Sequence, residues 1–159
     1  MTAELARLAE VRATRAGLDE QELDLIDRAR HDGATWAQIA TALGLGSRQA
    51  AEQRRHRLVA ARRSRRQRLD LVLPPQIVTL RTAVADLERW IAADRRWDRR
   101  FRRAALVRST VDVALDAAPG SLYALALHLV ADLAEAGEEL PPPVRSAAAK
   151  LTAVLSTSR

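Results

Sequence analysis

The chain has 159 residues, a formal net charge of +6 and no cysteine. This length fits one ordinary domain or two very small ones and excludes a multidomain enzyme. The lack of cysteine excludes disulfides and thiolate metal sites. Alanine and leucine dominate the apolar residues, and aromatic residues make up only 3% of the chain. Because strands favour β-branched and aromatic residues, this composition predicts an all-α protein.

The apolar stretches are too short to cross a membrane. The longest, residues 122–131, is half the length that a span needs and includes His128. No basic leader followed by an apolar segment precedes the first helix, so the sequence predicts no secretory signal. We expect a cytoplasmic protein without a membrane partner.

Positive charge is concentrated in one segment. Residues 48–68 contain nine arginines and one glutamate, for a net charge of +8, whereas residues 1–47 have five arginines and eight acids, for a net charge of −3. Residues 69–159 are close to neutral, at +1. A short basic segment of this kind is typical of a surface that binds nucleic acid.

Glycines divide the first half of the chain into helical segments. Gly17 separates the first two, the Gly33 turn ends the second, and Gly44 ends the third. We expect helices over residues 2–16, 19–31, 35–43 and 47–68. Prolines divide the second half, where we expect helices from Pro74 onwards, over 97–117, over 121–136 with a Ser121 cap, and over 143–155.

The third and fourth helices have strong signals at their starts. Thr35 and Gln38 have the spacing of a capping box, in which each side chain bonds to the backbone amide of the other residue. Gly44 tolerates the left-handed conformation that follows a helix, and Ser47 is a good N-cap for the next one.

The segment from Ala34 to Leu58 has the layout of a helix-turn-helix. Ala40 is small where the two helices cross, Leu45 fills the angle after the turn, and Ala50 and Leu58 face inward from the second helix. We therefore predict a helix-turn-helix DNA-binding domain over residues 1–68.

A helical bundle is expected over residues 74–156. Its first helix has apolar residues in a heptad pattern, with spacings of 4, 3, 4, 3 and 4. The pattern is shorter than three heptads, which leaves both packing inside the bundle and a short dimer contact open. The members of the pattern are Leu73, Ile77, Leu80, Val84, Leu87 and Ile91.

The same segment resembles a known family. Residues 33–40 (GATWAQIA), 43–45 (LGL) and 47–52 (SRQAAE) look like the helix-turn-helix of actinobacterial DNA-binding regulators, including regulators of a small heat-shock protein. The resemblance covers residues 20–60. It implies a DNA-binding regulator with Ser47, Arg48 and Gln49 in the recognition helix.

The start of a recognition helix enters the major groove, so its residues are the candidates for base contacts. These candidates are Ser47, Arg48, Gln49, Glu52, Gln53 and Arg55. The arginines further along point in too many directions to read one groove and are expected to meet phosphates. The phosphate candidates are Thr35, Gln38, Arg54, Arg57, Arg62, Arg63, Arg65 and Arg66.

A second basic cluster surrounds Trp97 and Phe101, with Trp90 nearby. One interpretation has the aromatic residues filling the bundle core while arginines cover them, and the other has a second surface that binds phosphates. The arginines concerned are Arg96, Arg99, Arg100 and Arg103.

No catalytic or metal-binding pattern is visible, so the sequence predicts neither an enzyme nor a cofactor. His128 lies among leucines and is expected in the core.

The predicted function is a transcriptional regulator of double-stranded DNA, acting as a homodimer through the C-terminal half and located at the nucleoid. The alternatives are a sequence-tolerant nucleoid-associated protein and a module that contacts the transcription machinery.

Overall fold

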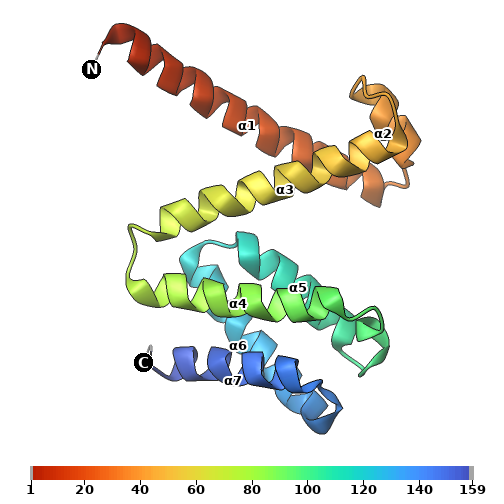
Figure 1. Ribbon diagram of the computed structural model, residues 1–159, viewed down its shortest axis with the longest axis vertical. Coiled ribbons are helices and arrows are strands. Elements are labelled where there is room, and N and C mark those ends of the chain that lie inside the picture. Colours follow the sequence, from red (N-terminus) through yellow and green to blue (C-terminus); the bar gives the residue numbers. More distant parts are fainter. Residues whose placement is uncertain (1, 158–159) are drawn as a thin grey trace. The chain divides into compact units, whose positions relative to one another are not determined.

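A computed structural model describes residues 2–157, and within them the protein is all-helical, as its composition predicted. The helices comprise 84% of the residues, and the described part of the chain has no strand. Figure 1 shows the seven α-helices in chain order. They are α1 (Ala3–His31), α2 (Trp36–Ala42), α3 (Arg48–Asp70), α4 (Pro75–Ala93), α5 (Ala104–Asp116), α6 (Pro119–Ala136) and α7 (Pro142–Thr157).

The chain divides into two compact units. The first ends at Ser64 and the second begins at Arg65, so the boundary falls inside α3. Each unit has its own hydrophobic core. None of the described helices has the length and apolar character needed to cross a membrane.

The first helix is longer than the sequence predicted. Residues 3–31 form one α-helix, so the expected break at Gly17 is wrong. A glycine inside a helix costs only about 1 kcal/mol relative to alanine, and the rest of this long segment favours helix. No atom of another part of the chain lies within 4 Å of a Cβ placed on Gly17, so the residue makes no close approach either.

Two tight turns shape the rest of the first unit. After α1, Gly33 has φ +92°, and the amide of Ala34 donates to the carbonyl of Ala29 at 2.9 Å. After α2, Gly44 has φ +66°, and the amide of Leu45 donates to the carbonyl of Ala40 at 2.8 Å. Both glycines have the positive φ that often follows the last turn of a helix. Glycine adopts this conformation without strain because it has no Cβ atom.

The predicted starts of α2 and α3 are confirmed. The Thr35 amide donates to Gln38 Oε1 at 2.8 Å, and the Gln38 amide donates to Thr35 Oγ1 at 3.2 Å, which completes the capping box of α2. The Ala50 amide donates to Ser47 Oγ at 3.1 Å at the start of α3. These bonds satisfy amides that the first turn of a helix leaves without a backbone acceptor.

The core of the first unit joins α1, α2 and α3. Its buried side chains are Leu23, Ile26, Ile39, Ala40, Ala51 and Leu58. The predicted inward positions of Ala40 and Leu58 are confirmed, but Ala51 is the buried alanine of α3 and Ala50 is only half-buried. Ala51 and Leu58 are seven residues apart, which is close to two full turns and keeps both on one face.

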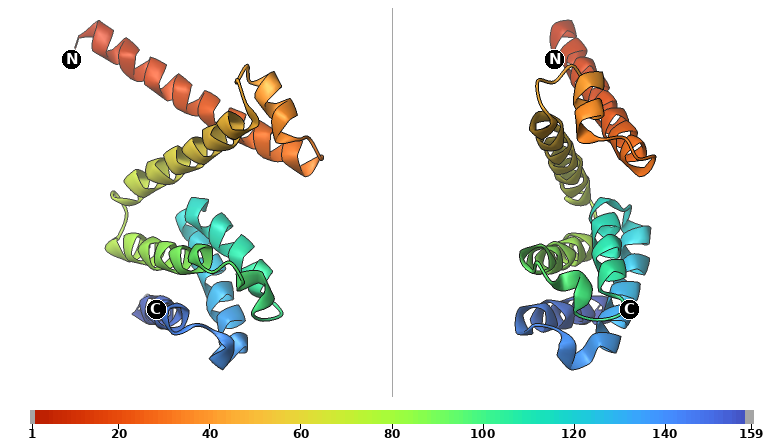
Figure 2. Two further views of the ribbon diagram at one scale, coloured as in Figure 1. Left: turned by 45° about the vertical axis from the view of Figure 1, so that its right-hand side comes forward. Right: turned by 90° about the vertical axis from the view of Figure 1, so that its right-hand side faces the viewer.

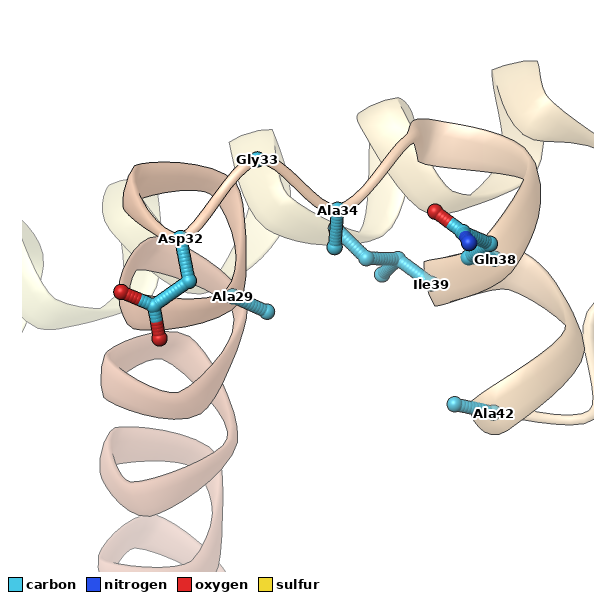
Figure 3. Close-up of a pocket in the computed structure, with 7 residues that line it drawn as sticks. All are labelled: Ala29, Asp32, Gly33, Ala34, Gln38, Ile39 and Ala42. Carbon is cyan, nitrogen blue, oxygen red and sulfur yellow. The ribbon is translucent and has the colours of Figure 1, made fainter.

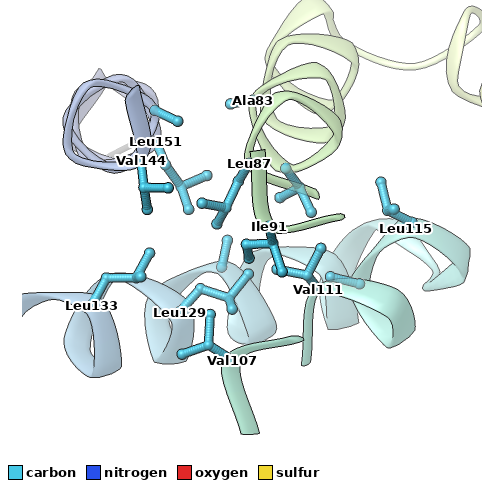
Figure 4. Close-up of a cluster of buried hydrophobic side chains, with 14 of the residues drawn as sticks. Ala83, Leu87, Ile91, Val107, Val111, Leu115, Leu129, Leu133, Val144 and Leu151 are labelled. Carbon is cyan, nitrogen blue, oxygen red and sulfur yellow. The ribbon is translucent and has the colours of Figure 1, made fainter. Parts of the chain in front are cut away.

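The second unit is a bundle of α4, α5, α6 and α7 (Figure 4). Four members of the heptad pattern, Leu80, Val84, Leu87 and Ile91, are at most 2% exposed and pack against the other helices of this unit. The pattern therefore serves packing within the bundle. Leu73, which precedes α4, is 37% exposed and lies outside this core.

Three expectations in the second unit are wrong. Residues 97–99 form a separate 3-10 turn, and α5 begins only at Ala104 because the Trp97 indole donates to the Ala104 carbonyl at 2.7 Å and folds the segment back. Ala118 rather than Ser121 is the N-cap of α6, since Pro119 suits its first turn. His128 is exposed, on the side of α6 away from the core.

Candidate nucleic-acid interface

The N-terminal half of α3 presents two different faces. The inner face packs into the core through Ala51 and Leu58. On the outer side Gln49, Gln53 and His56 are all exposed. Their spacing of four and three residues places them on one face of the helix, above successive turns. These outward side chains are amides and an imidazole, all of which can donate and accept hydrogen bonds.

Arg48 and Glu52 border this outer face. The Arg48 guanidinium lies 3.5 Å from the Glu52 carboxylate, and its side chain is 73% exposed. An ion pair as exposed as this one contributes little stability, so the guanidinium can exchange it for another partner at low cost. Ser47 is also exposed, with its Oγ engaged as the cap of α3.

Arg54 points the other way, towards α1. Its guanidinium donates to both oxygens of Glu22 at 2.8 Å and to Asp19 at 3.0 Å. The hydrogen bonds from Arg54 lower the pKa of Glu22, and the same contacts raise the pKa of Arg54. The basic run predicts a contact of Arg54 with DNA phosphates, whereas in the structure Arg54 joins α1 and α3.

Two further arginines of α3 pair with α1. Arg55 Nε donates to Asp27 at 2.6 Å, and Arg62 lies 3.6 Å from Asp24. The Arg55 side chain is 34% exposed, and the bond directs it towards α1 rather than towards the outer face. Four acids of α1 thus balance arginines on one side of α3, which accounts for part of the opposite charges of residues 1–47 and 48–68.

The remaining phosphate candidates differ in their surroundings. Arg57 is exposed, one turn beyond Gln53 on α3. The side chains of Thr35 and Gln38 are both engaged in the capping box. Three other arginines of α3, namely Arg63, Arg65 and Arg66, are half-buried. Arg65 and Arg66 belong to the second unit.

The second basic cluster contains Trp97 and Phe101. Trp97 is fully buried, and Phe101 packs edge-on against it with ring centroids 5.4 Å apart. Packing of these two residues in the core is therefore confirmed, whereas Trp90 is 45% exposed. Arg103 forms ion pairs with Asp132 and Glu135 across the bundle.

Ion pairs also hold Arg100 in this cluster. Arg100 binds Asp94, and its guanidinium lowers the pKa of that carboxyl group. Arg96 and Arg99 are exposed. Two of the four candidate arginines are thus tied to nearby acids, and two extend from the 3-10 turn and the residue before it.

An open depression lies at the corner between α1 and α2 (Figure 3). Its only side chains with polar groups are Asp32 and Gln38, and the other lining residues are Ala29, Gly33, Ala34, Ile39 and Ala42. Gln38 is already engaged in the capping box. Among the residues that the structure describes, no group of three or more His, Asp or Glu side chains is arranged to hold a metal ion.

Sequence reasoning missed one feature of this site, the pairing of α1 acids with α3 arginines. The only signal for it was an acidic run at residues 19–27 followed by a basic one. Comparisons of the chain with known protein families, with curated proteins and with solved structures found no match.

Proposed function

We propose that the protein is a transcriptional regulator that binds double-stranded DNA, with α2 and α3 as a helix-turn-helix and α3 as the recognition helix. The observation that carries this proposal is the outer face of α3, where exposed Gln49 and Gln53 follow a capped helix start and stand next to the exposed guanidinium of Arg48. In a helix-turn-helix these are the positions that meet base edges in the major groove.

Each side chain of this face has a natural partner among the bases. An arginine binds O6 and N7 of guanine with two hydrogen bonds, and a glutamine binds N6 and N7 of adenine in the same way. Arg48 would leave Glu52 to bind guanine, and the Glu52 carboxylate would then accept from the amino group of a cytosine. His56 lies at the far end of this face and would reach the wall of the groove.

The arginines of α3 that pair with α1 have a structural role in this function and do not contact DNA. Arg54 and Arg55 act as positioning residues, because they fix the angle at which α3 leaves the core and so the direction of its outer face. Arg57 is the phosphate contact that the exposure of the helix favours most. A phosphate contact adds affinity without selecting a sequence.

The proposal is tested by removing one base-reading side chain. Gln49→Ala should lower the affinity for a duplex selected from a random pool by about tenfold to hundredfold and relax the preference at one base pair, as loss of a bidentate contact does. Gln21→Ala is the matched control, because Gln21 is an exposed glutamine on α1. Equal affinity and equal preference for the two variants would contradict the proposal.

A sequence-tolerant nucleoid-associated protein is the second candidate. It is favoured by the charge of +8 in residues 48–68 and by the exposed Arg96 and Arg99 of the second cluster. Tight and steeply salt-dependent binding to every duplex, with no enriched motif, would support it. If no duplex is bound at low salt, a module that contacts the transcription machinery becomes the better explanation.

A further inference from the structure

The N-terminal part of α1 carries an apolar face that no other element of the first unit covers. Leu5, Leu8 and Val11 are 53%, 64% and 46% exposed. This part of the helix extends beyond the region where α1 crosses α3 (Figure 2). We call the three residues the arm face of α1.

The arm face continues a face of α1 that is buried further along. Leu5 and Leu8 precede Leu23 and Ile26 by eighteen residues, which is five full turns, so the two pairs point the same way. Leu23 and Ile26 are 0% and 3% exposed in the core of the first unit. One continuous stripe of α1 is thus half covered by α2 and α3 and half uncovered.

We propose that a second copy of this chain covers the arm face, through antiparallel pairing of the two α1 helices about a two-fold axis at Leu8. In such a pair the residues at equal distances before and after Leu8 meet across the axis. Leu5 therefore meets Val11 of the second copy, and the two copies of Leu8 meet each other. The pairing removes six large apolar side chains from water.

The charges beside the arm face match this arrangement. Glu4 and Arg12 stand one turn before and one turn after Leu8. Antiparallel pairing brings each Glu4 next to the Arg12 of the other copy, whereas parallel pairing would bring like charges together. Leu18, also exposed at 58%, lies ten residues after Leu8, about 15 Å along the helix from the axis and beyond the contact formed by residues 5–11.

The proposed dimer contact lies on α1, whereas the sequence predicted a dimer through the C-terminal half. It does not depend on DNA binding, because the contact uses no residue of the outer face of α3. Dimers of this kind would present two recognition helices to one duplex, which is what a regulator needs to select a long site.

Sedimentation of the full chain without DNA tests the contact. We expect a dimer at micromolar concentration, a monomer for Leu8→Glu, and a dimer for Leu18→Glu, which makes the same change at an equally exposed leucine. A monomeric parent protein, a dimeric Leu8→Glu variant, or dissociation of both variants would overturn the proposal. Circular dichroism of each variant, with helix content equal to that of the parent, excludes unfolding as the cause.

Charge exchange and cross-linking test the antiparallel arrangement. Glu4→Arg and Arg12→Glu should each weaken the dimer roughly three- to tenfold, and the double variant should restore it. Because the chain has no cysteine, Leu8→Cys should form a disulfide between copies on mild oxidation, whereas Leu18→Cys should not. Failure of the double variant to restore the dimer, or cross-linking only at residue 18, would exclude this pairing.

The proposed function and this contact can fail separately. The Leu8→Glu monomer keeps α3 unchanged, so its binding to a duplex with a single half-site should equal that of the parent protein. Loss of the dimer together with unchanged half-site binding supports both proposals. A stable dimer that binds no duplex would remove the function and leave the contact standing.

Discussion

The most buried charges of the second unit belong to one pair, Asp70 and Arg81, which are 1% and 3% exposed. Arg81 binds Asp70 at the end of α3 and donates to the carbonyls of Ala114, Leu115 and Ala117 at 2.8–3.0 Å. These carbonyls lie at the end of α5, where a helix leaves acceptors without backbone partners and where positive charge is favourable. One guanidinium thus joins α3, α4 and α5.

Removal of either charge of this pair should therefore lower the free energy of unfolding strongly. Asp70→Asn leaves the Arg81 charge buried without its counterion, and we expect the free energy of unfolding to fall by about 3–5 kcal/mol. Urea denaturation of the full chain measures this change. Asp86→Asn is the control, because Asp86 pairs with Arg89 at the surface and its loss should cost less than about 1 kcal/mol. Equal effects of the two substitutions would show that burial of the pair is unimportant.

The lowered pKa of Glu22 predicts how the stability of the protein depends on pH. Its pKa lies below the usual value of 4.5 because Arg54 donates to the charged form. A lowered folded-state pKa means that the pair stabilises the protein above the unfolded-state pKa and that this contribution is lost as the pH falls through the folded-state value.

We therefore expect Glu22→Gln to reduce stability at neutral pH and to lose less stability than the parent protein between pH 5 and about pH 3. Thermal unfolding at a series of pH values measures the difference. If the unfolding temperatures of the parent and the variant fell equally with pH over this range, the interaction with Arg54 would not stabilise the charged form of Glu22.

At the scale of elements, local signals predicted the start and end of α2 and the start of α3. A capping box, a glycine turn and an N-cap each depend on residues a few positions apart, which the sequence displays directly. The interaction of Arg54 with Glu22 joins residues 32 positions apart, and no local spacing reveals which arginine of a basic run will turn inward. The break expected at Gly17 failed because glycine weakens a helix without ending it.

The division of α3 into two sides predicts different results for two arginines. Arg57→Ala should weaken binding to any duplex and lower the slope of log affinity against log salt by about one, with stability unchanged. Arg54→Ala should lower the stability of the first unit and leave the salt slope unchanged, because the parent guanidinium is neutralised by α1. Fluorescence anisotropy at several salt concentrations and urea denaturation together distinguish them. A lower slope for Arg54→Ala would mean that Arg54 contacts phosphate.

At the scale of the whole molecule, composition predicted the all-helical fold. The apolar side chains of the heptad pattern in α4 pack into the core of the second unit. The sequence left packing and dimer contact open there because a short apolar pattern looks the same in both. Charge totals were less informative, since they did not reveal which arginines pair within the chain. In the second basic cluster Arg100 and Arg103 are bound to acids, and only removal of Arg96 and Arg99 tests a further DNA contact.

We expect the double variant Arg96→Ala and Arg99→Ala to bind an arbitrary duplex with the salt slope of the parent protein, because the proposed DNA contacts lie on α3. Titration of the duplex at increasing salt measures this slope. A decrease of about two would mean that both arginines meet phosphates and that the second unit also binds DNA.

The central claim is that the outer face of α3 reads the sequence of duplex DNA. Its most direct test is selection from a random pool of duplexes, followed by affinity measurement for the selected duplex and a scrambled one at the same salt concentration. We predict an enriched motif and a preference of about a thousandfold or more, as specific DNA-binding proteins have. Equal affinity for the two duplexes, or no binding to either at low salt, would contradict the claim.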